Sequence, residues 1–124
     1  MRLFIADDSE DLRARLVGIL NEIDGIEIIG ETGDAGEAIE GVGRLKPDIV
    51  ILDIRMPGGN GILALKSIKK MSDAPVVIMF TNYPYLQYRK TCIEAGADFF
   101  FYKAVEIEKL IELLKKMVKT KKQQ

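Results

Sequence analysis

Residues 49–61 read IVILDIRMPGGNG, a stretch in which an uninterrupted apolar run leads into Asp53 and a glycine-rich loop. A short, continuous run of Val, Ile and Leu is typical of a strand that is buried on both faces, as in a parallel sheet. Gly58, Gly59 and Gly61 lack the lysine that follows the glycines of a nucleotide-binding loop, so we interpret them as giving the loop freedom to move. The segment therefore predicts a buried strand with a carboxylate at its end.

Apolar runs of similar length occur on both sides of this segment, and most of them are also continuous rather than alternating. The runs are Leu3–Ala6, Ile26–Ile29, Ile49–Leu52, Val76–Phe80 and Phe99–Tyr102. Helical patterns with short connections separate these five predicted strands. Strict alternation of strand and helix predicts an α/β fold, in which helices cover both faces of a parallel sheet through right-handed crossovers.

Three of the intervening stretches carry apolar residues at helical spacing. These residues are Leu12, Leu16, Ile19, Leu20 and Ile23; Ala35, Ala38, Ile39, Val42 and Leu45; and Ile107, Leu110, Ile111, Leu114 and Met117. Ser9 or Asp8 can cap the first helix, and Pro84 suits the first position of a fourth helix that ends near Gly96. We therefore expect one domain in residues 1–119, followed by a polar tail in residues 120–124.

The composition excludes several classes of protein. The 124 residues have room for one domain, and the single cysteine, Cys92, excludes an internal disulfide and suits a reducing compartment, by default the cytoplasm. No apolar run approaches the roughly 20 residues that cross a membrane, and a net charge of −1 provides no basic field for nucleic acid. The absence of histidine excludes histidine zinc sites, serine–histidine–aspartate triads and a phosphohistidine carrier within this chain.

Reactive side chains follow four of the five predicted strands. Asp7 and Asp8 come after the first strand, Asp53 after the third, Thr81 after the fourth and Lys103 after the fifth. In a parallel sheet the carboxyl ends of the strands lie along one edge, where ligands bind. Each of these residues means little alone, since Asp7 and Asp8 also suit a helix cap and Asp53 a turn. Together they predict one polar cleft.

The charges of this cleft predict a bound cation. Two carboxylates about 4 Å apart repel each other by roughly 4 kcal/mol at an effective dielectric constant near 20. Oxygen ligands without histidine or cysteine favour a hard ion, Mg²⁺ or a relative such as Mn²⁺. Because Mg²⁺ keeps coordination positions open for phosphate oxygens, the cleft is suited to accept a phosphoryl group.

The whole set of residues resembles the receiver domain of response regulators in two-component signal transduction. The likeness covers residues 3–119. Its local sequence motifs (IADDSE, GETGDAGEAIE, LDIRMPG, EAGADFF) are most similar to those of receivers that precede helix-turn-helix output domains. The resemblance implies a flavodoxin-like, doubly wound sheet of five parallel strands in the order 2-1-3-4-5, with five helices. The residues that carry it are Asp7, Asp8, Asp53, Thr81 and Lys103.

The resemblance also implies a metal site and a phosphoacceptor. Asp53 would take the phosphoryl group from a phosphohistidine of a sensor histidine kinase, or from a small phosphodonor. Asp8 would bind Mg²⁺ directly, Asp7 mostly through water, and the backbone carbonyl of Arg55 would complete the protein ligands together with Asp53. Lys103 and Thr81 would contact phosphoryl oxygens. Such a protein promotes its own phosphotransfer and dephosphorylation and is not an enzyme in the usual sense.

Signal output in this family involves a threonine and an aromatic residue. By resemblance, Thr81 would move toward the phosphoryl group and leave space for the ring of Phe100, which would change the face formed by the fourth helix, fifth strand and fifth helix. That face would regulate an unknown partner or output domain. We expect a monomer that forms dimers, if at all, on phosphorylation, with no binding to membranes and no direct binding to nucleic acid.

Two other functions are compatible with the fold. A metal-dependent aspartyl-phosphate hydrolase typically has a second carboxylate two residues after its nucleophile, where this chain has Arg55. A phosphorylation-independent binding module would not need the complete set of polar residues that the chain retains. A further departure is Ala104, since proline usually follows the family lysine. A cis bond before alanine would cost roughly 2.5–4 kcal/mol, so we expect Lys103–Ala104 to be trans.

Packing of the aromatic residues can also be predicted. Phe99, Phe100 and Phe101 are interpreted first as buried strand residues. Tyr88, Cys92 and Ala95 share one helical face and are expected in the core, whereas Tyr83 and Tyr85 are expected at the surface. The lysines near the C-terminus are interpreted as favourable charges at the end of a helix.

Overall fold

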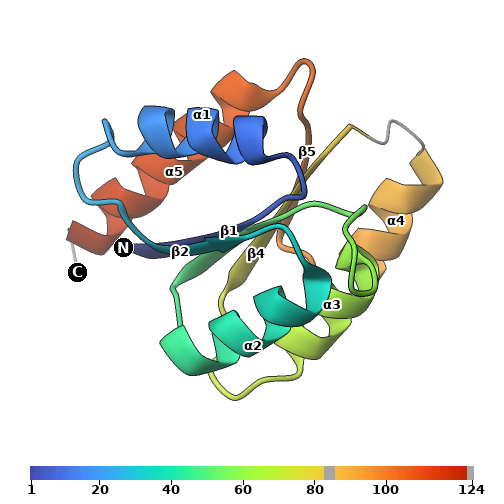
Figure 1. Ribbon diagram of the computed structural model, residues 1–124. Coiled ribbons are helices and arrows are strands. Elements are labelled where there is room, and N and C mark those ends of the chain that lie inside the picture. The colour runs from blue at the N-terminus through green and yellow to red at the C-terminus, as the bar shows by residue number, and fades with distance from the viewer. Residues whose placement is uncertain (83–85, 123–124) are drawn as a thin grey trace.

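The computed structural model describes residues 1–82 and 86–122 and confirms the alternation of strands and helices (Figure 1). In chain order its elements are β1 (Arg2–Ala6), α1 (Glu10–Leu20), β2 (Glu27–Thr32), α2 (Ala35–Leu45), β3 (Ile49–Leu52), α3 (Gly61–Lys69), β4 (Val76–Thr81), α4 (Leu86–Glu94), β5 (Phe99–Tyr102) and α5 (Ile107–Lys122). The proposed role of Pro84 in starting α4, and the exposure of Tyr83 and Tyr85, concern residues outside the described part of the chain.

The five strands form one parallel sheet in the order β2-β1-β3-β4-β5, as predicted. β3 occupies the centre, with Ala6 of β1 and Met79 of β4 as the register partners of Leu52 on its two sides. Strand β1 therefore ends at the level where β3 ends. This register brings the residues that follow the two strands, Asp7 and Asp53, to the same point of the carboxyl edge.

Helices cover both faces of the sheet, α1 and α5 on one face and α2, α3 and α4 on the other (Figure 1). Alternate residues of β3 enter the two cores: Ile49 and Ile51 pack with α1 and α5, and Val50 and Leu52 pack on the opposite side. All four of these side chains are buried. Burial on both faces explains why the run is continuous in apolar residues rather than alternating.

Local sequence signals account for the helix starts. Ser9, and not Asp8, is the N-cap of α1, since its hydroxyl accepts a hydrogen bond from the Leu12 N–H. Asn60 caps α3 in the same way through Leu63.

The C-terminal helix α5 runs to Lys122 and so extends into the segment that was expected to be a polar tail from residue 120. A run rich in lysine has good helix propensity, which explains the longer helix.

Two aromatic side chains are more exposed than the sequence predicts. Phe99 is 37% exposed because it begins β5, which lies at the edge of the sheet. Tyr88 is also 37% exposed, whereas Cys92 on the same helix is buried as predicted.

Over the described residues there is no cis peptide bond, so Lys103–Ala104 is trans, as expected. No helix in residues 1–82 or 86–122 has the length and apolar character needed to cross a membrane.

Candidate functional site

Backbone hydrogen bonds fix the residues that directly follow three strands. The Asp7 N–H donates to the Thr32 carbonyl at 2.9 Å, and the Asp53 N–H donates to the Ala6 carbonyl at 2.9 Å. The Lys103 N–H donates to the carbonyl of Thr81 at 2.9 Å. Each ladder therefore continues for one residue beyond the strand, which holds the three side chains at one edge of the sheet.

Lys103 lies between the two carboxylates that emerge from β1 and β3. Its Nζ donates to Asp53 Oδ2 at 2.8 Å and also forms an ion pair with Asp7 Oδ2. The three side chains are only 9%, 7% and 3% exposed for Lys103, Asp53 and Asp7. The remaining carboxylate oxygens accept backbone N–H groups, that of Ile54 at 2.7 Å for Asp53 and that of Ser9 at 2.9 Å for Asp7.

A third carboxylate joins this pair at its solvent side. One oxygen each from Asp7, Asp8 and Asp53 lies within 4.8 Å of the others, with Asp8 exposed and the other two buried. The three carboxylates outnumber the Lys103 ammonium, which pairs with two of them. An all-oxygen set with one open side fits the donors and the accessible positions that Mg²⁺ prefers. The residues present therefore fit the predicted metal ion.

Burial and pairing act in opposite directions on the two ionised groups. Burial raises the pKa of Asp7 above its ordinary value, although hydrogen bonds from Lys103 and the Ser9 N–H oppose this effect. Burial alone would lower the pKa of Lys103, but the hydrogen bonds and charges of Asp53 and Asp7 outweigh it, so that the pKa is raised. Lys103 therefore stays charged at neutral pH, whereas burial destabilises the charged form of Asp7 unless cations lie next to it.

The remaining predicted site residues occupy the positions that the sequence implies, but their contacts are of different kinds. Thr81 is fully buried at the end of β4. Phe100 is buried, with its ring edge-on to Tyr102 at a centroid distance of 5.3 Å and the Arg89 guanidinium 5.9 Å from its centre. The Arg55 side chain is exposed in the loop after Asp53. Neither the role of the Arg55 carbonyl nor the coupling of Thr81 to Phe100 follows from these positions, and both stay predictions.

The loop after Asp53 uses its glycines for geometry rather than for freedom alone. Gly58 and Gly59 have φ angles of 77° and 124°, which L-residues rarely adopt. Gly61 is needed for space, because a Cβ there would lie 1.8 Å from the carbonyl oxygen of Asp53. Its N–H also donates to the Ile54 carbonyl. The loop is therefore folded back tightly against the candidate site.

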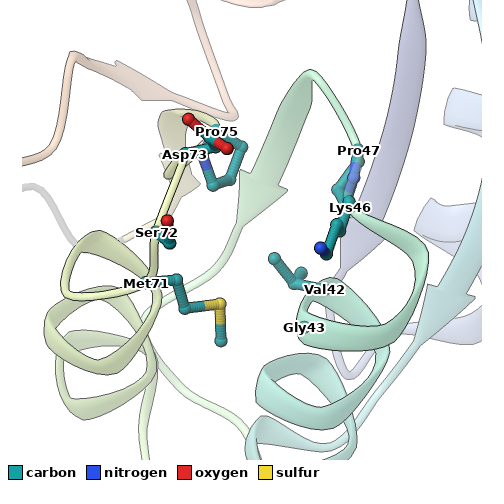
Figure 2. A pocket seen from close by; sticks show the side chains of 8 residues that line it. All are labelled: Val42, Gly43, Lys46, Pro47, Met71, Ser72, Asp73 and Pro75. Carbon is teal, nitrogen blue, oxygen red and sulfur yellow. The ribbon is translucent and has the colours of Figure 1, made fainter.

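Two hollows in the surface differ in their relation to this site. One, of about 410 Å³, borders Lys103 and includes Ser9, Leu12 and Asn82. Figure 2 shows another, of about 260 Å³, whose lining includes Lys46 and Pro47 before β3 and Pro75 before β4. Residues that precede parallel strands lie at the amino edge of the sheet. The second hollow is therefore at the opposite end of the domain and is no part of the cleft.

Comparison with known proteins agrees with this arrangement. Residues 3–115 match the family described as the response regulator receiver domain. The chain is 41% identical over 99 residues to a protein-glutamate methylesterase/protein-glutamine glutaminase of Geobacter metallireducens, covering 78% of this chain and 28% of that protein. It is 31% identical over 122 residues to the uncharacterized transcriptional regulatory protein YvfU of Bacillus subtilis, covering 98% of this chain and 61% of that protein.

A solved structure leads to the same class. The DNA-binding response regulator of the LuxR family from Staphylococcus aureus has a TM-score of 0.87 and 30% identity to this chain, covering 94% of this chain and 98% of that one. Fold and strand-end residues together define a CheY-like receiver domain, and the chain belongs to the response regulator receiver domain family. The chain spans less than two thirds of the length of the two curated relatives, and their other segments have no counterpart in the alignment.

Proposed function

We propose that this receiver domain is a phosphoacceptor that takes a phosphoryl group onto Asp53 in the presence of Mg²⁺ or Mn²⁺. The observation that carries the proposal is the buried Asp53 carboxylate, 2.8 Å from the Lys103 ammonium and within 4.8 Å of the carboxylate oxygens of Asp7 and Asp8. A lone surface aspartate has no such surroundings. Here one nucleophilic oxygen is grouped with the cation and the acidic residues that phosphoryl transfer requires.

The metal ion would be held by Asp7, Asp8 and Asp53, with the Arg55 carbonyl as a further ligand. When bound, Mg²⁺ supplies charge neutralisation for the oxygens of the transferring phosphoryl group. Asp53 keeps one oxygen occupied by the Ile54 N–H at 2.7 Å, and this hydrogen bond fixes the orientation of its carboxylate. The other oxygen, which now accepts from Lys103, is therefore the one in position to attack phosphorus.

Lys103 would exchange one partner for another during the reaction. As the oxygen of Asp53 forms its bond to phosphorus, the bond from phosphorus to the donor nitrogen breaks and its electron pair stays on the donor. The carboxylate then loses its charge as an acyl phosphate, and the ammonium can pair with a phosphoryl oxygen instead. The Thr81 hydroxyl would donate to another. The buried position of both groups at the strand ends supports these roles.

The donor and the output are inferred from the same family. We propose a sensor histidine kinase as the natural donor, meeting this domain in the cytoplasm, with small phosphodonors as substitutes. Phosphorylation would change the face of α4, β5 and α5 through Thr81 and Phe100 and so regulate an output partner or an output domain. Residues 1–119 would form the receiver domain and residues 120–124 a polar C-terminal tail. The buried ring of Phe100 against α4 supports this route, because a shift of the ring would disturb α4.

Labelling with acetyl phosphate tests the proposal. Wild type should form an acid-stable, base-labile adduct in Mg²⁺ and lose it in excess chelator, and Asp53→Asn should form none. Asp98→Asn is a matched control, since Asp98 also accepts from a lysine ammonium, at 3.0 Å, but lies away from the metal cluster. Undiminished labelling of Asp53→Asn, or full labelling in chelator, would show that the proposal is wrong.

A further inference from the structure

Arg13 reaches from the first turn of α1 to the loop that carries the metal-site carboxylates. Its Nη1 donates to the main-chain carbonyl of Asp7, and its Nε pairs with Glu31 Oε1 at 3.2 Å. The side chain is only 16% exposed. Since the guanidinium contacts a backbone carbonyl and not a reacting carboxylate, any effect on the site has to act through the position of the loop.

The bonded carbonyl belongs to the peptide unit between Asp7 and Asp8. That unit is planar, so fixing its carbonyl fixes the direction in which the chain enters Asp8. On the strand side, the N–H of Asp7 is held by the Thr32 carbonyl at 2.9 Å. β2 therefore anchors the loop on both sides of Asp7, directly through Thr32 and indirectly through Glu31 and Arg13.

Gly33 leaves the space that this arrangement requires. A Cβ at Gly33 would lie 2.8 Å from Nη1 of Arg13 and 3.4 Å from both the Asp7 oxygen and the Asp8 Cα. Its φ angle lies outside the positive region in which glycine is favoured, so clearance rather than backbone conformation explains the residue. The guanidinium, at the end of a flexible side chain, is the group that would have to move.

We propose that Arg13 is a positioning residue of the metal site, which fixes the Asp7–Asp8 peptide and thereby the geometry of the two carboxylates. The inference rests on the proposed function, because it needs Mg²⁺ to bind at Asp7, Asp8 and Asp53. Loss of such a supporting contact typically lowers metal affinity about 10–100-fold. Loss of the Arg13 charge by itself would change metal affinity in the opposite direction, since removing a positive group close to three carboxylates strengthens the binding of a divalent cation.

The opposite signs make Mg²⁺ affinity a decisive measurement. Titration followed by backbone amide NMR should give Arg13→Ala an Mg²⁺ affinity about tenfold below wild type. Arg13→Lys should be similarly weak, because an ammonium keeps the charge but lacks the fork that reaches both oxygens. Gly33→Ala changes no charge, displaces only the guanidinium and should also weaken binding, with altered amide shifts at Asp8 before any metal is added.

Arg2→Ala is the matched control, since Nη1 of Arg2 donates to the Lys46 carbonyl at 3.0 Å on the opposite edge of the sheet. It should lose no more stability than Arg13→Ala in urea unfolding, and its Mg²⁺ affinity should stay within about twofold of wild type. If wild type binds Mg²⁺ and the three variants at Arg13 and Gly33 bind it equally well or more tightly, only the role of Arg13 is refuted. If wild type itself shows no saturable Mg²⁺ shifts at Asp7, Asp8 and Asp53, the proposed metal site fails and the role of Arg13 with it.

Discussion

Removal of the Lys103 ammonium is the perturbation whose size follows most directly from the structure. Lys103→Met keeps most of the apolar stem but leaves Asp7 and Asp53 facing each other without a cation. Both carboxylates are nearly inaccessible, 3% and 7% exposed, and each currently pairs with the same Nζ. Breaking a buried ion pair from one side costs roughly 3–5 kcal/mol. Because the cluster opens to solvent at Asp8, we expect a loss of about 3 kcal/mol, at the lower end of that range.

Urea unfolding followed by circular dichroism measures this loss, and Mg²⁺ provides an internal test. In excess chelator the variant should show the full decrease in the free energy of unfolding. In saturating Mg²⁺ most of the difference from wild type should disappear, because a divalent ion replaces the missing positive charge. Mg²⁺ at about 100 times its Kd adds about 2.7 kcal/mol to any protein that binds it only when folded. The variant should gain more than wild type, since no ammonium competes for its carboxylates.

The pH dependence of the same proteins has a defined sign. The folded-state pKa of Lys103 is raised, so its contribution to stability is complete below the ordinary lysine pKa of about 10.4 and is lost as the pH rises through the raised value. On the alkaline side of neutrality, the difference in unfolding free energy between wild type and Lys103→Met should therefore shrink as the pH rises through that raised value. The folded-state pKa of Asp7 is also raised, so its ionisation costs stability above the ordinary aspartate pKa, and that cost is relieved by acid.

Lys69→Met is the control for this experiment. Lys69 Nζ pairs with Asp98 at 3.0 Å, but its side chain is 23% exposed and the carboxylate 36% exposed. The control should lose no more than about 1 kcal/mol and should respond to Mg²⁺ as wild type does. A loss in Lys103→Met as small as in the control, or an equal loss with and without Mg²⁺, would refute the assignment of Lys103 as the cation that balances the buried carboxylates.

Three further predictions test other parts of the structure. Gly61→Ala should destabilise the domain by roughly 1–3 kcal/mol and lower labelling of Asp53, because its Cβ would overlap the Asp53 carbonyl. Gly18→Ala, whose Cβ would have nothing within 4 Å, should instead stabilise the domain by roughly 0.5–1 kcal/mol. Equal effects of the two substitutions in urea unfolding would contradict the clash at Gly61. Burial raises the pKa of the Cys92 thiol to about 11, so a thiol reagent at neutral pH should modify it only on unfolding, and rapid modification of the native protein would be incompatible with that burial. A phosphate analogue should shift the sedimentation of a monomer toward a dimer through the α4–β5–α5 face, where Phe99 is 37% exposed, whereas one unchanged mass would remove the dimer.

The strands and the candidate site could largely be predicted from the sequence because both depend on local patterns. Continuous apolar runs such as Ile49–Leu52 mark strands buried on both faces, and the residues that follow such strands must share one edge of a parallel sheet. This reasoning requires no knowledge of individual contacts. It led to Asp7, Asp53 and Lys103, which the structure brings into direct contact or into one cluster.

Contacts between segments distant in sequence were decided only by the tertiary structure. No local pattern in the sequence singles out Arg13, which acquires its role because the fold places Glu31 of β2 and the Asp7 carbonyl within reach of its guanidinium. Gly61 seemed a flexible loop residue, but the return of the loop over Asp53 leaves no room for a side chain.

Burial at the edges of the sheet was decided in the same way. The aromatic run of β5 resembles that of a central strand, yet β5 has a neighbour on one side only, and Phe99 is exposed at its start. Periodicity reports how a residue relates to its own strand or helix, whereas clearance, pairing and exposure depend on which other segment lies opposite. Which segment lies opposite a residue is decided only when the chain folds. Arg13, Gly61 and Phe99 therefore acquire their roles from the tertiary structure and not from their local sequence.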